Sequence, residues 1–172
     1  MYQRKGVIMD LGKNKKVLFL TDVEPELNSF LQQKTLTKPE DMLTIQSYGA
    51  KITHPYGDIM RSIILTIYQE NVEEIVVVGT KGKGTVPIDI QSQLGSESKK
   101  WKDHVDTMDY LFQYCIPEFS GGKASEWLYG KENITESVRK SVDIIRQHPL
   151  VPSYVNVEGF VLENGKGEFS IV

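Results

Sequence analysis

The sequence predicts an α/β fold with a mainly parallel sheet flanked by helices and an antiparallel hairpin near the C-terminus. Short apolar runs alternate along the chain with segments whose apolar residues recur at helical spacing, which is the pattern of βαβ units. Asn164-Gly165, between two runs with β-branched and aromatic residues, is a strong signal for a tight hairpin turn.

Three apolar runs are the expected parallel strands. Residues 15–22 (KKVLFLTD) and 73–79 (EEIVVVG) are almost continuously apolar, which is typical of strands buried on both faces. Residues 42–46 (MLTIQ) offer a further strand. The last strand and the hairpin are expected within residues 154–172.

Four segments have the spacing of helices. Pro25 suits the first turn of the earliest one, and Asp58 could cap the second. The last carries an apolar stripe that includes Val138 and Val142, and Pro149 ends it. The expected helices are residues 24–33, 58–71, 101–115 and 133–148.

Composition describes one ordinary globular domain, residues 1–172. The net charge of −3, from 20 Lys+Arg and 23 Asp+Glu, provides no overall field that would attract nucleic acid. Cys115 is the only cysteine, so no intrachain disulfide can form, and the chain suits a reducing compartment. There is no apolar run long enough for a signal peptide or a membrane span, and we expect a cytoplasmic protein.

The loop after the strand at residues 73–79 is rich in glycine and lysine. It contains Lys81, Gly82, Lys83, Gly84 and Thr85, whose ammonium and backbone N–H groups could bind an anion. The spacing of a nucleotide-binding phosphate loop is not met, because Thr85 rather than lysine follows Gly84.

Three acidic residues follow the strand at residues 15–22. Asp22, Glu24 and Glu26 could together bind magnesium through oxygen ligands. Acidic residues at a helix start are, however, favoured by the helix dipole without any metal, and that interpretation is preferred. The three histidines, His54, His104 and His148, have no second histidine or cysteine at ligand spacing, so we interpret them as surface or packing residues.

Several stretches, in the same order along the chain, resemble the β-class carbonic anhydrases. They are KVLFLTDVEPEL, IQSYGA, MRSIILTIY, EEIVVVGTKGKG and ESVRKSVDIIRQHPLVPSYVNVEGFVLENGKGEF. The resemblance covers residues 15–84 and 136–172. It implies a Rossmann-like fold, a zinc site at the carboxyl edge of the sheet, and a homodimer.

The residues that carry the family's chemistry differ here. Asp22 stands where the resemblance places the first zinc cysteine, Glu24 at the dyad aspartate and Glu26 at the dyad arginine. Thr80 stands at the zinc histidine and Lys83 at the second zinc cysteine. The family's zinc site needs two thiolates and an imidazole, and one cysteine cannot supply them. We therefore predict no zinc, no other metal or cofactor, and no hydration of carbon dioxide.

The altered residues suggest what replaces the zinc. The Lys83 ammonium is expected to face Asp22 and Glu24, which leaves no buried charge unpaired. The site is then either a relic held by that ion pair or a pocket for a small anion such as bicarbonate or phosphate, in a binding or regulatory protein. Two alternatives remain: Lys83 with Asp22 or Glu24 as an acid–base pair in a different reaction, and residual carbonate dehydratase activity through an unrecognised metal site.

Overall fold

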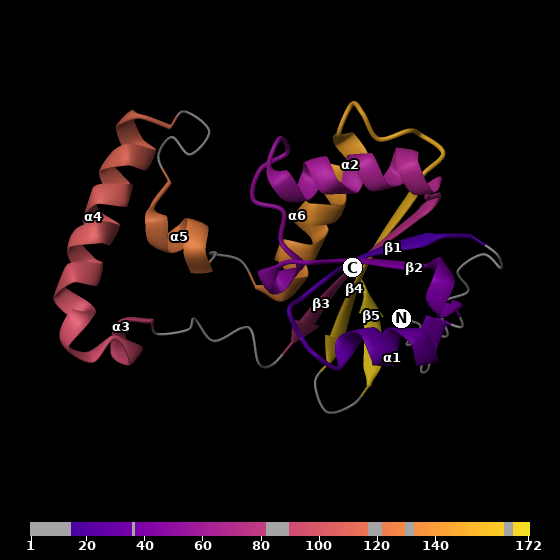
Figure 1. Cartoon of the computed structure of the whole chain (residues 1–172), viewed down its shortest axis with the longest axis horizontal. Helices are drawn as coiled ribbons and strands as arrows, with labels where there is room; N and C mark the ends of the chain where they lie inside the picture. The colour runs from indigo at the N-terminus through magenta and orange to yellow at the C-terminus, as the bar shows by residue number, and fades with distance from the viewer. Residues whose placement is uncertain (1–14, 36, 82–89, 117–121, 130–132, 164–166) are drawn as a thin grey trace. The chain divides into compact units, whose positions relative to one another are not determined.

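A computed structural model describes residues 15–35, 37–81, 90–116, 122–129, 133–163 and 167–172. The protein contains a five-stranded sheet in the order β2-β1-β3-β4-β5 (Figure 1). Adjacent strands are parallel except for β4 and β5, which form the antiparallel hairpin. The strands are β1 (Val17–Thr21), β2 (Met42–Gln46), β3 (Glu74–Lys81), β4 (Asn156–Glu163) and β5 (Glu168–Ile171). The predicted fold class is confirmed.

The chain forms two compact units. The first contains residues 1–85 and 133–172 and holds the sheet, and the second contains residues 86–132. The expectation of a single domain, residues 1–172, stays a prediction. In the described part of the chain, no helix is long and apolar enough to cross a membrane.

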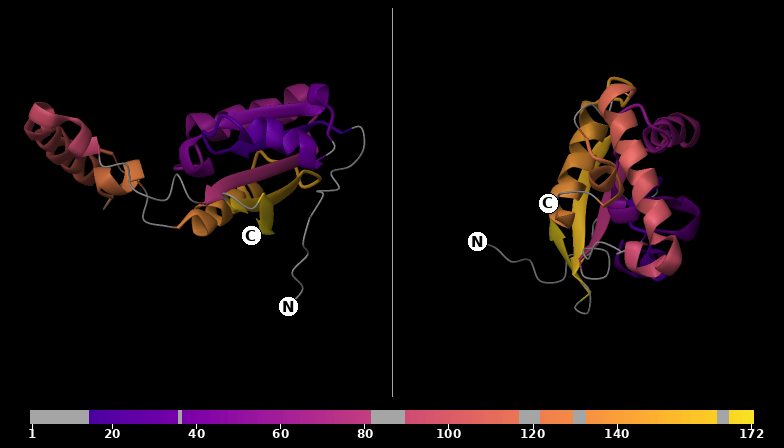
Figure 2. Two further views of the ribbon diagram at one scale, coloured as in Figure 1. Left: turned by 90° about the horizontal axis from the view of Figure 1, so that it is seen from below. Right: turned by 90° about the vertical axis from the view of Figure 1, so that its left-hand side faces the viewer.

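In the first unit, helices cover both faces of the sheet (Figures 1 and 2). On one face, α2 (Asp58–Glu70) and α6 (Ile134–Gln147) pack against residues such as Leu20 and Val77. On the other, Leu27 and Leu31 of α1 (Leu27–Thr35) pack against alternate residues of the same strands. This division follows from the pleat, which sends successive side chains of a strand to opposite faces.

The first helix begins later than predicted. Glu24 and Glu26 lie before Leu27, in a turn in which the Leu27 N–H donates to the Glu24 carbonyl at 3.2 Å. Asp58 is the first residue of α2, and Gly57 is its cap. The predicted hairpin is confirmed by the pairing of β4 with β5, whereas Asn164-Gly165 lies outside the described residues.

The second unit is helical where the structure describes it. It contains α3 (Ile90–Gln93), α4 (Ser98–Tyr114) and α5 (Ala124–Tyr129). The rings of Phe112 and Trp127 meet edge to face at 6.0 Å, and the Asp109 carboxylate accepts the Ala124 N–H at 2.6 Å. Cys115 is exposed and caps the C-terminus of α4.

Candidate functional site

Asp22 is the first polar residue beyond β1, at the carboxyl edge of the sheet. Its backbone N–H donates to the Val78 carbonyl of β3 at 3.1 Å, which continues the strand pairing by one residue. Its side chain is buried, and Oδ1 accepts the N–H of Val23 at 2.8 Å and the N–H of Gly49 at 2.9 Å. Both donors bind the same oxygen, so the carboxylate is fixed in orientation and joins β1 to the loop after β2.

That loop contains a sharp turn with two left-handed residues. Gly49 has φ 67° and Ala50 has φ 48°. The Ser47 N–H donates to the Thr21 carbonyl at 2.9 Å, and the Ala50 N–H donates to the Ser47 carbonyl at 2.8 Å. The turn therefore presents the Gly49 N–H to Asp22 from a backbone that is itself anchored to β1.

Thr80, which the sequence resemblance aligns with a zinc histidine, lies on the other face of the sheet, where its partner on β4, Leu162, packs. It continues the row of Val76 and Val78, which pack with α1. Asp22 follows the end of β1 and accepts the Gly49 N–H of the turn that contacts α6, on the opposite face. The structure therefore places Asp22 and Thr80 in different layers.

Thr80 and Thr21 share an unusual property. Both are almost fully buried, and their Oγ1 atoms have no hydrogen-bond partner in the part of the chain that the structure describes. A buried hydroxyl without a partner destabilises a fold by about 1–3 kcal/mol. Among the described residues, these two hydroxyls therefore make no stabilising hydrogen bond.

We expect Thr80→Val to stabilise the protein by about 1 kcal/mol, because valine keeps the shape and removes an unpaired polar group. Urea unfolding followed by circular dichroism would measure the change. Thr35→Val is the matched control: Thr35 is also buried, but its hydroxyl donates to the Leu31 carbonyl at 2.8 Å. It should not stabilise. A loss of stability in Thr80→Val would mean that the Thr80 hydroxyl makes a contact in solution.

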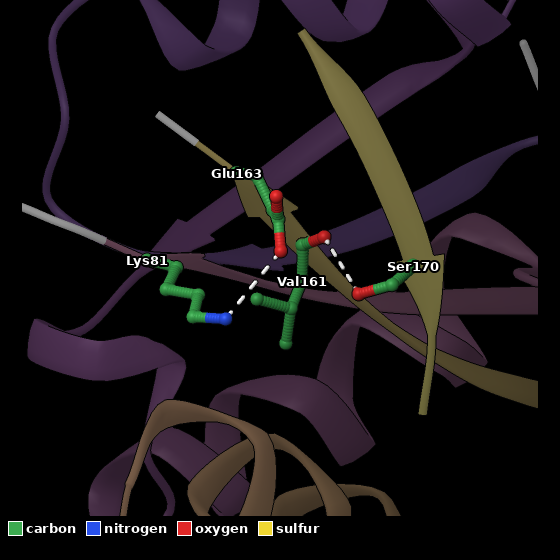
Figure 3. A network of polar contacts seen from close by, with 4 residues as sticks. All are labelled: Lys81, Val161, Glu163 and Ser170. Atoms are coloured by element: carbon green, nitrogen blue, oxygen red, sulfur yellow. Dashed lines mark hydrogen bonds and ion pairs between the residues drawn. The ribbon is translucent and has the colours of Figure 1, made fainter. Parts of the chain in front are cut away.

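The described part of the anion-loop candidate consists of Lys81 alone. Its Nζ lies 3.4 Å from Oε1 of Glu163, its neighbour on β4, as Figure 3 shows. Both side chains are partly exposed, so the pair contributes little to stability. The Lys81 ammonium is nevertheless already paired with the Glu163 carboxylate. Gly82, Lys83, Gly84 and Thr85 lie outside the described residues.

Asp22, Glu24 and Glu26 do not form a metal-binding group in the part of the chain that the structure describes. Glu24 is half-buried and Glu26 is exposed. Among the described residues, no three or more histidine, cysteine, aspartate or glutamate side chains are grouped so that they could hold a metal ion. The donors that the resemblance aligns with zinc ligands, the Asp22 carboxylate and the Thr80 hydroxyl, also differ in chemistry from the thiolate and imidazole of the family's site.

The histidines take part in local packing. The Nδ1 of His54 accepts the Tyr56 N–H at 3.1 Å, and the Nδ1 of His148 accepts the Leu150 N–H at 3.2 Å. The Tyr56 ring meets the His148 ring at 5.7 Å. His104 is exposed on α4. These contacts agree with the interpretation of the histidines as surface and packing residues.

Ser137 and Ser141 belong to no recognisable motif and were not predicted as site residues. Both are buried on the inner face of α6, at the same spacing as its apolar residues. Two small polar residues within an apolar stripe indicate that the opposing segment offers polar partners. Here those partners belong to the turn that contains Gly49.

Comparisons with known proteins agree on one family. The chain is 56% identical over 163 residues to YbcF of Bacillus subtilis strain 168, which is provisionally named a carbonic anhydrase-like protein, and the match covers 95% of this chain and 90% of YbcF. No family model matches the chain.

Solved structures show the same fold. The β-carbonic anhydrase isoform I of Trichomonas vaginalis has a TM-score of 0.66 and 21% identity, over 94% of this chain and 85% of that one. A tetrameric β-carbonic anhydrase of Sordaria macrospora has a TM-score of 0.56 and 12% identity, over 94% of this chain and 82% of that one. Together with the identity to YbcF and the order of the strands, these likenesses show that the chain belongs to the β-class carbonic anhydrase family.

Proposed function

We propose that this protein is a carbonic-anhydrase-like protein that does not hydrate carbon dioxide and acts instead as a binding or regulatory protein for a small anion. The observation that supports this most directly is the arrangement of Asp22. At the position of a zinc ligand, its carboxylate is occupied in holding the N–H groups of Val23 and Gly49. The Asp22 carboxylate therefore holds the loop after β2 against the end of β1.

Zinc chemistry would need a different set of donors. A zinc-bound water reaches a pKa of about 7, compared with about 15.7 for bulk water, and this supplies hydroxide as the nucleophile. The chain has a single cysteine, Cys115, which is exposed at the end of α4. The residues at the zinc positions, a carboxylate, a hydroxyl and an ammonium, do not fit the metal.

The Lys83 ammonium is proposed to take the place of the metal. With Oδ1 of Asp22 holding two backbone donors, Oδ2 is the oxygen that an ammonium would approach. Such a pairing raises the pKa of a lysine and so disfavours a role as general base. The ammonium and the N–H groups of the loop would then attract a bicarbonate- or phosphate-sized anion.

The proposal also includes the oligomeric state, the compartment and the absence of a cofactor. We propose a homodimer in the cytoplasm, without a cofactor. The tetrameric relative in Sordaria macrospora supports self-association, and the lone cysteine suits a reducing compartment. Size-exclusion chromatography with light scattering would give the oligomeric state directly.

We expect tag-free protein to contain far less than one zinc per chain and to leave the rate of carbon dioxide hydration at its uncatalysed value. Inductively coupled plasma mass spectrometry and stopped-flow hydration on one sample would measure both. A zinc-containing β-carbonic anhydrase purified in parallel controls for metal loss. Near-stoichiometric zinc with activity would contradict the proposal.

The proposed binding of a small anion can be tested by NMR on the same protein. Bicarbonate and inorganic phosphate, titrated at constant ionic strength, should shift the amide resonances of residues 81–85 in wild type, and Lys83→Met should abolish the shifts. Lys81→Met is the matched control, because Lys81 is already paired with Glu163. Equal shifts in wild type and Lys83→Met would remove Lys83 from the proposed site.

A further inference from the structure

Ser141 lies in the middle of α6 and is completely buried. Its hydroxyl makes two hydrogen bonds to the loop after β2. Oγ accepts the N–H of Ile52 at 3.0 Å and donates to the carbonyl of Ala50 at 3.0 Å. A hydroxyl can donate once and accept at its lone pairs, so this side chain is used in both capacities.

The two backbone groups that Ser141 binds belong to buried residues and need hydrogen-bond partners within the protein. Ala50 and Ile52 are buried, and buried backbone groups require partners. Ala50 also has φ 48°, a left-handed conformation that residues with a Cβ seldom adopt. Such a conformation persists only where the surroundings impose it. Ser141 supplies this restraint by bonding one group at the left-handed residue and one group two residues later.

The neighbouring serine, Ser137, adds a weaker contact. Its Oγ lies 3.5 Å from the Gly49 carbonyl, at the limit of a hydrogen bond. Two side chains one helical turn apart on α6 therefore face consecutive residues of the turn. The turn is held from α6 on one side and by Asp22 on the other.

We infer that Ser141 is a positioning residue that orients the Asp22 carboxylate by holding the Gly49–Ala50 turn against α6. The chain of contacts is continuous: Ser141 fixes the peptide groups at Ala50 and Ile52, and the adjacent Gly49 N–H donates to Oδ1 of Asp22 at 2.9 Å. The role of Ser141 in ligand recognition rests on the proposed function, because Asp22 is the carboxylate that would receive the Lys83 ammonium.

The contacts predict a local effect at an atom that Ser141 does not touch. Without the hydroxyl, the turn loses both of its bonds to Ser141 and keeps only the weaker contact with Ser137, so the Gly49 amide opens more often. A residue that only fills space in α6 would lower global stability and leave the Gly49 amide protected relative to the sheet. The exchange rate of this one amide therefore separates positioning from packing.

Hydrogen exchange of the full chain, followed by NMR, tests the inference. In Ser141→Ala we expect protection of the Gly49 amide to fall at least about tenfold more than protection of amides in β3, since its local opening becomes easier. Val142→Ala is the matched control: Val142 is the next residue, is buried, and packs in the core of this face. It should lower the protection of Gly49 no more than that of β3.

Ser141→Cys keeps the inference testable if the alanine variant does not fold. A thiol is of similar size and forms weak hydrogen bonds, so Gly49 protection should fall by an intermediate amount. Protection of Gly49 that follows β3 in both serine variants would overturn the inference. Zinc in the wild-type protein would overturn the proposed function and would not affect this result, so the two failures are distinguishable.

Discussion

Replacing Gly79 with alanine is expected to destabilise the protein by about 3 kcal/mol, which is at the upper end of overpacking effects in a close-packed interior. A Cβ at this position would lie 2.7 Å from Ile134 Cγ1 and 2.7 Å from Val138 Cγ2. Both side chains belong to α6, and Val138 is completely buried. The Ile134 and Val138 side chains, or the helix that carries them, must shift to accept even one methyl group.

Gly159→Ala provides a graded comparison on the neighbouring strand. Its Cβ would lie 3.0 Å from Val138 Cγ1 and 3.0 Å from Val142 Cγ2, so the clash is with the same helix but is milder. We expect a loss of about 1 kcal/mol. Urea denaturation of both variants would give the two free energies of unfolding, and equal values would show that α6 does not rest on Gly79 as the structure indicates.

The close approach at Gly79 also bears on the site. Gly79 lies in register with Asp22, one residue beyond the Thr21–Val78 pair, and α6 carries Ser141. A helix displaced by an alanine at position 79 would carry Ser141 away from the turn. Gly79→Ala should therefore also increase exchange of the Gly49 amide relative to amides in β1.

The second large effect is expected at Asp22. Asp22→Ala should lower the free energy of unfolding by about 3 kcal/mol, because hydrogen bonds to a charged acceptor contribute about 1.5–3 kcal/mol and the Gly49 N–H is left without its partner. Asp22→Asn keeps an oxygen that can accept both N–H groups. It should lose only about 1 kcal/mol, which represents the charge.

The Asp22→Asn variant also allows a test of the proposed ion pair between Asp22 and Lys83. If the Lys83 ammonium is held by Asp22, a double-mutant cycle of Asp22→Asn with Lys83→Met should show coupling of at least about 0.5 kcal/mol in thermal or urea unfolding. Additive effects would mean that Lys83 is held elsewhere. Equal losses in Asp22→Ala and Asp22→Asn would contradict the role of Asp22 as the acceptor for Gly49.

The sequence alone predicted the α/β class, the mainly parallel sheet, the long helices α2, α4 and α6, the shorter α1 with an earlier start, and the C-terminal hairpin. These features are written in local periodicity: continuous apolar runs for β1 and β3, and helical spacing for α2, α4 and α6. The count of one cysteine was also enough to question the family's zinc site, because ligand chemistry does not depend on conformation.

Only the tertiary structure decided how the edge of the sheet is organised. Gly49 lies 27 residues from Asp22, and the partners of Ser141 lie about 90 residues from it, and no local pattern encodes such separations. The placement of Thr80 on the face opposite Asp22 depends on strand register, which a one-residue shift would reverse. Composition determined which chemical groups the site could contain, and the packing of α6 on β3 and on the Gly49–Ala50 turn determined which of them meet.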